Sequence, residues 1–158
     1  MDELDLRLID LFTAEPRVGV LEASRRLGVA RGTVQARLDR LAARGVVTSW
    51  GPQLSPEALG HPVTAFLTLE IHQAGAERAH DAVGSHLAEI PEVLEVHTTT
   101  GAGDLLARVV ARSNDDLQRV IDAVLAHPLI TRSSTVIALA TQVPHRVLPL
   151  ARASVSRR

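Results

Sequence analysis

Arginine is concentrated in one short stretch of this 158-residue chain. Residues 26–47, RLGVARGTVQARLDRLAARGVV, contain five arginines. From Arg17 to Trp50 the chain has seven arginines and two acidic residues, although its overall formal charge is −1. A local excess of positive charge in a nearly neutral chain indicates contacts with an anionic polymer, of which nucleic acid is the commonest.

The stretch from about Arg31 to Arg44 is expected to form a helix with one apolar face, made by Val34, Leu38 and Leu41. Small residues occupy the opposite face, so the helix fits a major groove about 12 Å wide. Thr33 offers a methyl and a hydroxyl group and Gln35 a bidentate amide. We therefore assign base contacts to Gly32, Thr33, Gln35 and Ala36. Phosphate contacts are assigned to Arg25, Arg26, Arg31, Arg37, Arg40 and Arg44. The alternative is an ordinary amphipathic helix with a solvated arginine face.

Two shorter helices are expected before this one. Residues 2–14 predict a helix with Asp2 as N-cap and Asp5 at position N3. Its apolar face contains Leu4, Leu8, Leu11 and Phe12. Residues 20–27 predict a second helix, with Leu21 and Leu27 inward and Gly28 as a left-handed C-cap. Three helices at this spacing, the last one basic, are typical of a helix-turn-helix.

The remaining segments predict alternating strands and helices. We expect strands over 63–71, 93–100, 104–111 and 130–141, and helices over 75–90 and 114–127. The last helix would begin at Asn114 and place four residues inward: Leu117, Ile121, Val124 and Leu125. The second and third strands are joined by a tight hairpin at Gly101 to Gly103. This order is the ferredoxin-like βαββαβ arrangement.

The fold class is therefore α+β, and four regions are expected. Residues 1–50 form a winged helix-turn-helix, in which VVTSW at 46–50 is expected to be a strand, either one arm of the wing or part of the linker. Residues 51–62 form a linker rich in Gly and Pro. Residues 63–142 form the ferredoxin-like domain, and residues 143–158 form a tail without clear period, expected to be extended or loose. One face of the sheet would expose Phe66, Val96, Leu106 and Ile137, which favours dimerisation through the sheet.

Several motifs in this order resemble the Lrp/AsnC family of transcription regulators. MDELDLRLIDLF is similar to the family's opening helix, and LGVARGTVQARLDRLAARGVV to its recognition-helix signature. LSPEALG resembles its linker, TTTGAGDLLARV its effector-domain hairpin, and ITRSSTVIAL its closing strand. The resemblance covers about residues 1–142. It departs from the family pattern at Gly19, at Ala23–Ser24 and at Ala30, where the family often has a Ser cap.

The resemblance implies a regulator that binds double-stranded DNA and pairs as a homodimer, which assembles to a tetramer or octamer. It also implies a small effector, often an amino acid, held near the hairpin. By position, the effector residues are Thr100, Gly101, Ala102, Gly103 and Asp104, with Ser133 and Thr135 as weaker candidates. Backbone N–H groups of the hairpin would hold a carboxylate, and Asp104 would accept from an ammonium group. In the alternative, Gly101 and Gly103 only permit the turn and Asp104 caps it.

Other functions stay open at this stage. Some haem-biosynthesis decarboxylases resemble this family in fold, and His72, His80, His86, His97 and Arg108 would then contact propionates or iron. A DNA-binding architectural protein with little sequence preference is a third reading. The chain has no cysteine and no run of about 18 apolar residues that would span a membrane. We expect a cytoplasmic, nucleoid-associated protein with no catalytic residues, no metal and no cofactor.

Overall fold

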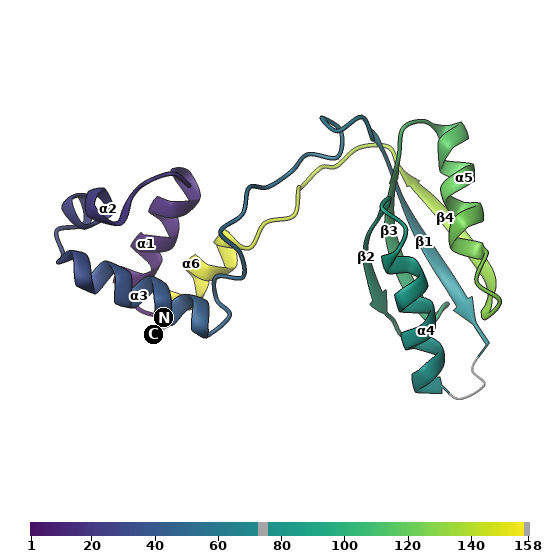
Figure 1. The fold of residues 1–158 in the computed structure, drawn as a ribbon, viewed down its shortest axis with the longest axis horizontal. Coiled ribbons are helices and arrows are strands. Elements are labelled where there is room, and N and C mark those ends of the chain that lie inside the picture. Colours follow the sequence, from purple (N-terminus) through teal and green to yellow (C-terminus); the bar gives the residue numbers. More distant parts are fainter. Residues whose placement is uncertain (73–75, 157–158) are drawn as a thin grey trace. The chain divides into compact units, whose positions relative to one another are not determined.

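The computed structural model describes residues 1–72 and 76–156, and the chain divides into two units. We call residues 1–52 together with 143–158 the helical unit, and residues 53–142 the sheet unit. The chain therefore passes between the units twice, once before residue 53 and once after residue 142 (Figure 1).

The helical unit begins with α1 (Glu3–Ala14), α2 (Val20–Leu27) and α3 (Arg31–Ala43). Asp2 caps α1 as predicted, in a reciprocal capping box with Asp5. The Asp5 N–H donates to Asp2 Oδ1 over 2.9 Å, and the Asp2 N–H donates to Asp5 Oδ2 over 3.0 Å. Two orphan N–H groups at the helix start are satisfied in this way, which fixes where α1 begins.

The turn between α2 and α3 is closed by Gly28, whose φ of 68° lies in the left-handed region that favours glycine. This prediction is confirmed. Val34, Leu38 and Leu41 are buried, as expected, and the cluster beneath them includes Leu8 and Ala23.

Two predictions for the first half of the chain are wrong. Leu21 is half exposed, and the side of α2 that is buried carries Ala23 and Ser24 instead. Residues 46–50 form no strand within the described chain, so no wing strand stands there. Trp50 instead contacts Phe12 of α1 edge to face, with ring centroids 5.7 Å apart. An aromatic contact to α1 thus fixes the segment that was expected to pair as a strand.

The segment 143–158 also differs from its prediction, because it is not an extended tail. It forms α6 (Leu148–Ser156), which lies beside α1 within the helical unit (Figure 1). Arg152 on α6 donates to Asp10 Oδ1 on α1 over 2.7 Å. A partner far away in the sequence stabilises a short helix that the sequence pattern was not used to predict.

The sheet unit has the predicted βαββαβ order. Its elements are β1 (Val63–Ile71), α4 (Ala76–Ala88), β2 (Val93–Thr98), β3 (Leu105–Ala111), α5 (Asn114–Leu125) and β4 (Ile130–Ala138). All pairings are antiparallel, in the order β2-β3-β1-β4. Gly75, where the first of these helices was expected to begin, lies outside the described residues.

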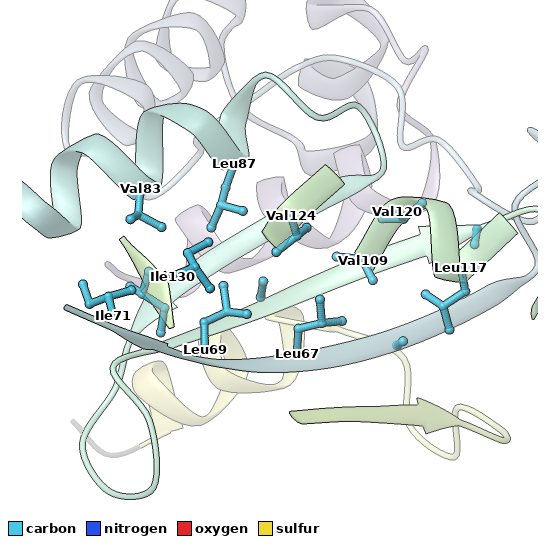
Figure 2. Close-up of a cluster of buried hydrophobic side chains, with 14 of the residues drawn as sticks. Leu67, Leu69, Ile71, Val83, Leu87, Val109, Leu117, Val120, Val124 and Ile130 are labelled. Carbon is cyan, nitrogen blue, oxygen red and sulfur yellow. The ribbon is translucent and has the colours of Figure 1, made fainter. Parts of the chain in front are cut away.

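The core of the sheet unit lies between one face of the sheet and its two helices. In Figure 2, Leu67 and Leu69 of β1 project toward Val83 and Leu87 of α4 and toward Val124 of α5. All five side chains are fully buried. Burial of each such side chain contributes roughly 1.5–3 kcal/mol of transfer free energy, which makes this cluster the main source of the unit's stability.

The start and inward face of α5 differ slightly from the prediction. Ser113, not Asn114, is the N-cap, since its side chain accepts from the Asp116 N–H over 3.1 Å. Val120 is fully buried in the core, whereas Leu125, which was expected there, is 37% exposed.

The sheet face away from the helices is only partly polar. Phe66 and Leu106 lie on this free face as predicted, with Thr68 next to both of them. Val96 and Ile137 do not, because the register pairs Val96 with Ala107 and Ile137 with Ala65, on the helix-covered face. On the free face, Val136 pairs with Phe66 and is 65% exposed.

Candidate nucleic-acid interface and effector hairpin

The side of α3 opposite its buried stripe is exposed and slim. The four residues assigned to base contacts are all exposed: Gly32, Thr33, Gln35 and Ala36. Gln35 Nε2 donates to Asp39 Oδ1 one turn further along, over 2.8 Å. This bond uses one of the two amide donors of Gln35, and the amide carbonyl remains an acceptor that this bond does not use.

Three of the six arginines assigned to phosphate contacts are well exposed. Arg31 and Arg44 stand at the two ends of α3, and within residues 1–72 and 76–156 neither has an acidic group within ion-pair distance. Arg25 is 70% exposed at its side chain and lies 3.9 Å from Glu22. These guanidinium groups are available to a polyanion.

Arg26 bonds instead to two carboxylates of its own unit. Its Nη1 lies 2.6 Å from Glu15 Oε1, and its Nε lies 2.8 Å from Glu22 Oε1. The hydrogen bond from Arg26 lowers the pKa of Glu22 below its usual value. Because all three side chains are about half exposed, this cluster contributes little to stability.

Arg37 and Arg40 converge on Asp5, the one fully buried carboxylate among the described residues. Arg37 Nη1 donates to Asp5 Oδ1 over 2.9 Å, and it also bonds to Asp2. Arg40 Nη2 donates to both carboxylate oxygens of Asp5, over 2.8 and 2.9 Å. The ion pairs join the start of α1 to the middle of α3 and so help to fix the orientation of the exposed face of α3.

The pKa values of both carboxyls reflect this arrangement. Burial would raise the pKa of Asp5, but hydrogen bonds from Arg37 and from the Asp2 backbone lower it below the ordinary value. The hydrogen bond from Arg37 lowers the pKa of Asp2 to about 2. Both carboxyls are therefore ionised at neutral pH and hold the two arginines by charge-assisted bonds.

Sequence reasoning assigned Asp5 only a capping role and missed this pairing. A signal was present, since Asp5 falls between Phe12 and Ile9 on the helical wheel of α1, at the edge of the apolar face. A carboxylate in an apolar face is seldom buried without a cationic partner. The wheel alone does not say which of the chain's arginines that partner is.

The predicted effector hairpin is held against the end of β1. The Asp104 N–H donates to the Leu69 carbonyl over 2.9 Å, and Asp104 Oδ2 accepts from the Ile71 N–H over 2.8 Å. Thr99 Oγ1 donates to the Gly103 carbonyl over 3.1 Å. The carboxylate of Asp104 therefore joins the hairpin to β1. This is a structural role like the capping role considered above as the alternative, and it does not depend on a ligand.

The glycines of this hairpin have separate reasons to be glycine. Gly101 has a φ of 112°, in the left-handed region. At Gly103 an added Cβ would lie 2.4 Å from the Thr68 methyl carbon and 3.1 Å from the Leu69 carbonyl oxygen. Thr100 and Ala102 are exposed beside them.

Ser133 and Thr135 lie on a different face from the place where the hairpin meets β1. They pair with Leu69 and Leu67, whose side chains belong to the helix-covered face. Thr68, which Gly103 approaches, points to the free face. Within one chain, the structure does not bring the two groups of effector candidates together.

The residues of the haem-enzyme alternative are also dispersed. His80 and His86 lie on α4, whereas His97 and Arg108 lie on the free face of the sheet, and His72 follows β1. Across residues 1–72 and 76–156, no three His, Cys, Asp or Glu side chains gather where a metal ion could bind. Nor does any helix in that part of the chain have the length and apolar character that crossing a membrane requires.

Sequence comparison matches both halves of the chain to known domains. The AsnC-type helix-turn-helix domain matches residues 1–42, and the Lrp/AsnC ligand binding domain matches residues 64–148. The second match alone spans more than half of the chain.

Known proteins are similar over nearly the full length. The HTH-type transcriptional regulator FL11 of Pyrococcus horikoshii is 29% identical over 150 residues, which cover 95% of this chain and 97% of that protein. The structure of E. coli AsnC superposes with a TM-score of 0.83 at 25% identity, covering 94% and 99% of the two chains. The feast or famine regulatory protein of M. tuberculosis, solved with L-methionine, gives 0.77 at 26% identity, covering 92% and 96%.

Proposed function

The chain belongs to the Lrp/AsnC family of transcriptional regulators, and from this premise we propose that it is a sequence-specific DNA-binding regulator controlled by an amino acid. A second copy would bring two α3 helices into successive major grooves. Such a protein would act on the nucleoid, in the cytoplasm. The observation that supports the proposal most directly is the exposed, slim face of α3.

Thr33 and Gln35 are proposed to read the bases. Both lie in the first half of α3, which enters the groove first in helix-turn-helix proteins, with Gly32 and Ala36 permitting a close approach. Gln35 would exchange its bond to Asp39 for a bidentate contact with an adenine. This exchange replaces one hydrogen bond by two, so that the correct base is favoured over others.

The arginines are proposed to divide into two groups. Arg25, Arg31 and Arg44 are free to meet phosphates. Arg40 keeps donors beyond the one nitrogen that bonds to Asp5 and is 46% exposed, so it can hold α3 in place and still contact a phosphate. Arg26 and Arg37 use their donors mainly within the helical unit.

The hairpin from Thr100 to Asp104 is proposed to hold the effector. Backbone N–H groups at Gly101 to Gly103 suit an amino-acid carboxylate. The L-methionine in the M. tuberculosis relative favours a zwitterionic amino acid as effector for this chain too. Ser133 and Thr135 would have to reach the same ligand from another copy, because within one chain they occupy a different face.

The free face of the sheet is proposed as the dimer interface. Phe66 and Val136 are exposed apolar side chains next to each other on it. Arg108 Nε, on the same face, is buried without a hydrogen-bond partner among the described residues. A second copy would cover the apolar surface and offer Arg108 an acceptor. Association of dimers into a tetramer or octamer would give the effector a means of changing half-site spacing.

The test of DNA reading is a pair of variants assayed against a footprinted operator and random duplex. Thr33→Ala/Gln35→Ala should reduce the specificity ratio by roughly 10-fold or more and leave the salt slope of binding unchanged. Arg31→Gln should weaken binding to both duplexes alike and lower the slope by about 1. If both variants bind as wild type does, α3 is not the reading element.

The test of the effector site is a thermal-shift screen of the amino acids, beginning with L-methionine. Asp104→Asn keeps an oxygen that accepts from the Ile71 N–H but removes the charge offered to an ammonium group. We expect this variant to fold and to lose the ligand-induced shift. A shift of wild-type size would exclude Asp104 from ligand binding and leave it a structural role only.

A further inference from the structure

Among the described residues, α6 is attached to the helical unit by an apolar stripe and by the ion pair of Arg152 with Asp10. Leu148, Ala151 and Val155 recur at helical spacing and are half-buried, whereas Leu150 is 71% exposed. Arg152 bonds to Asp10 through Nε and Nη2. Residues 143–158 are therefore part of the same unit as α3, although β4 precedes them in the chain.

This segment lies mostly outside the family domains. The helix-turn-helix match ends at residue 42 and the ligand-binding match at residue 148, where α6 begins. The functions of the two domains therefore do not account for it.

The charge of the helical unit depends on this segment. Residues 1–52 contain eight arginines and seven acidic residues, a net charge of only +1, because α1 contributes three of these acids and its two cap residues, Asp2 and Glu15, two more. Residues 143–158 contain four arginines and no acid, which raises the unit to +5. The sheet unit contains five arginines and eleven acids, a net charge of −6.

Internal ion pairs occupy several arginines of residues 1–52. Arg26, Arg37 and Arg40 already bond to carboxylates of that segment. Arg146, two residues before α6, is exposed. Arg157 and Arg158 follow α6 directly in the sequence. Much of the positive charge still available to a polyanion therefore lies on or next to this segment.

We propose that residues 143–158 are a second DNA-binding element, docked on the helical unit through α6, which contacts phosphates outside the major groove read by α3. This inference rests on the proposed function, since it presumes that α3 binds duplex DNA. The docking of α6 keeps Arg146, which precedes it by two residues, on the unit that α3 would anchor to DNA, so that its phosphate contact needs no separate encounter. The contacts add affinity without sequence preference.

The test compares two variants that remove the same charge from different units. Arg146→Gln/Arg157→Gln removes one arginine from each side of α6. The control, Arg78→Gln/Arg132→Gln, removes two exposed arginines from the sheet unit. Binding of each full-length protein to an operator duplex and to random duplex is measured between about 50 and 200 mM salt, a range over which phosphate contacts change affinity strongly. Folding is followed by the fluorescence of Trp50, the single tryptophan, which lies in the helical unit.

We expect Arg146→Gln/Arg157→Gln, the segment variant, to lower the slope of log K against log salt by about 1–2. It should weaken binding to the operator and to random duplex equally. The control should match wild type in slope, and both variants should keep the wild-type unfolding temperature. A slope equal to that of the control overturns the inference, as does unfolding of the helical unit in the segment variant, which would indicate a packing role. If wild type itself binds no DNA, the proposed function fails as well; if wild type binds and the slopes agree, only this inference fails.

Discussion

The two units of this chain are stabilised in different ways. The sheet unit has a buried cluster of fifteen hydrophobic residues, whereas the corresponding cluster of the helical unit has four, counting only described residues. The helical unit supplements its small core with ion pairs to a buried carboxylate, Asp5. Its net charge is opposite to that of the sheet unit. In the helical unit the face of α3 opposite its buried stripe stays exposed, so little apolar area remains to be buried. The ion pairs of Asp5 then help to hold α1 against α3.

The first prediction separates the two cores. Leu8→Ala should destabilise the helical unit by about 2–5 kcal/mol, because the side chain is fully buried in a small cluster. We expect Trp50 fluorescence to report unfolding at a lower temperature, while the β-sheet signal in circular dichroism is unchanged. Leu67→Ala, a fully buried residue of the sheet unit, should do the converse. If either variant lowers both transitions together, the units fold as one cooperative block.

The second prediction concerns the buried carboxylate. Asp5→Asn removes the charged partner of Arg40 and one of the two carboxylates bonded to Arg37, and should cost about 1–3 kcal/mol, less than a fully buried pair because both arginines are partly exposed. Chemical denaturation followed at Trp50 measures this cost. Asp2→Asn removes the charge that pairs with Arg37 at a half-exposed position and keeps an oxygen that can accept from the Asp5 N–H, so it is the matched control and should cost less. Equal costs would show that burial of Asp5 adds nothing.

The third prediction tests a close approach in the sheet unit. Gly103→Ala should destabilise this unit by about 1–3 kcal/mol, because the added methyl group meets the Thr68 side chain and the Leu69 carbonyl. Gly84→Ala is the control, since its added Cβ meets no heavy atom within 4 Å and alanine favours the middle of α4 by up to about 1 kcal/mol. The unfolding temperature of the sheet unit, followed by circular dichroism, should fall in Gly103→Ala and rise in Gly84→Ala. A neutral Gly103→Ala would mean that the hairpin shifts easily from β1.

The smallest effect is expected from acid. The pKa of Asp2 is about 2 in the folded chain and that of Asp5 is also lowered, so their ion pairs stabilise fully above the ordinary carboxyl pKa of about 4. This stabilisation is lost as pH falls from about 4 toward 2, as the carboxyls are protonated. Denaturation at Trp50 across that range should show the decline, and it should be shallower in Asp5→Asn. An identical decline in that variant would assign the acid sensitivity to other groups.

Helix and strand order could be predicted from the sequence because periodicity is local. Val34, Leu38 and Leu41 recur at helical spacing and are buried, and Gly28 marks the turn before α3. The exposed face of α3 follows from the same spacing. These features depend on residues within a few positions of one another, which the linear pattern contains in full.

Side-chain faces were mispredicted where the register shifts. Counting by two from Val93 and from Ile130 places Val96 and Ile137 on the free face. The pairing of β2 with β3 shifts between Val93 and Glu95, and that of β1 with β4 shifts between Glu70 and Ile71. Each irregularity reverses the alternation beyond it, and nothing in the strand's own sequence marks it.

A basic helix with a slim exposed face and a βαββαβ domain follow from the linear pattern of residues, because each depends on local spacing. The folded chain was needed to show that Asp5 binds Arg37 and Arg40, more than thirty residues away, and that α6 packs beside α1. Such contacts join segments that are far apart in the chain. Their partners are chosen by the packing of the whole unit, which no short stretch of sequence contains.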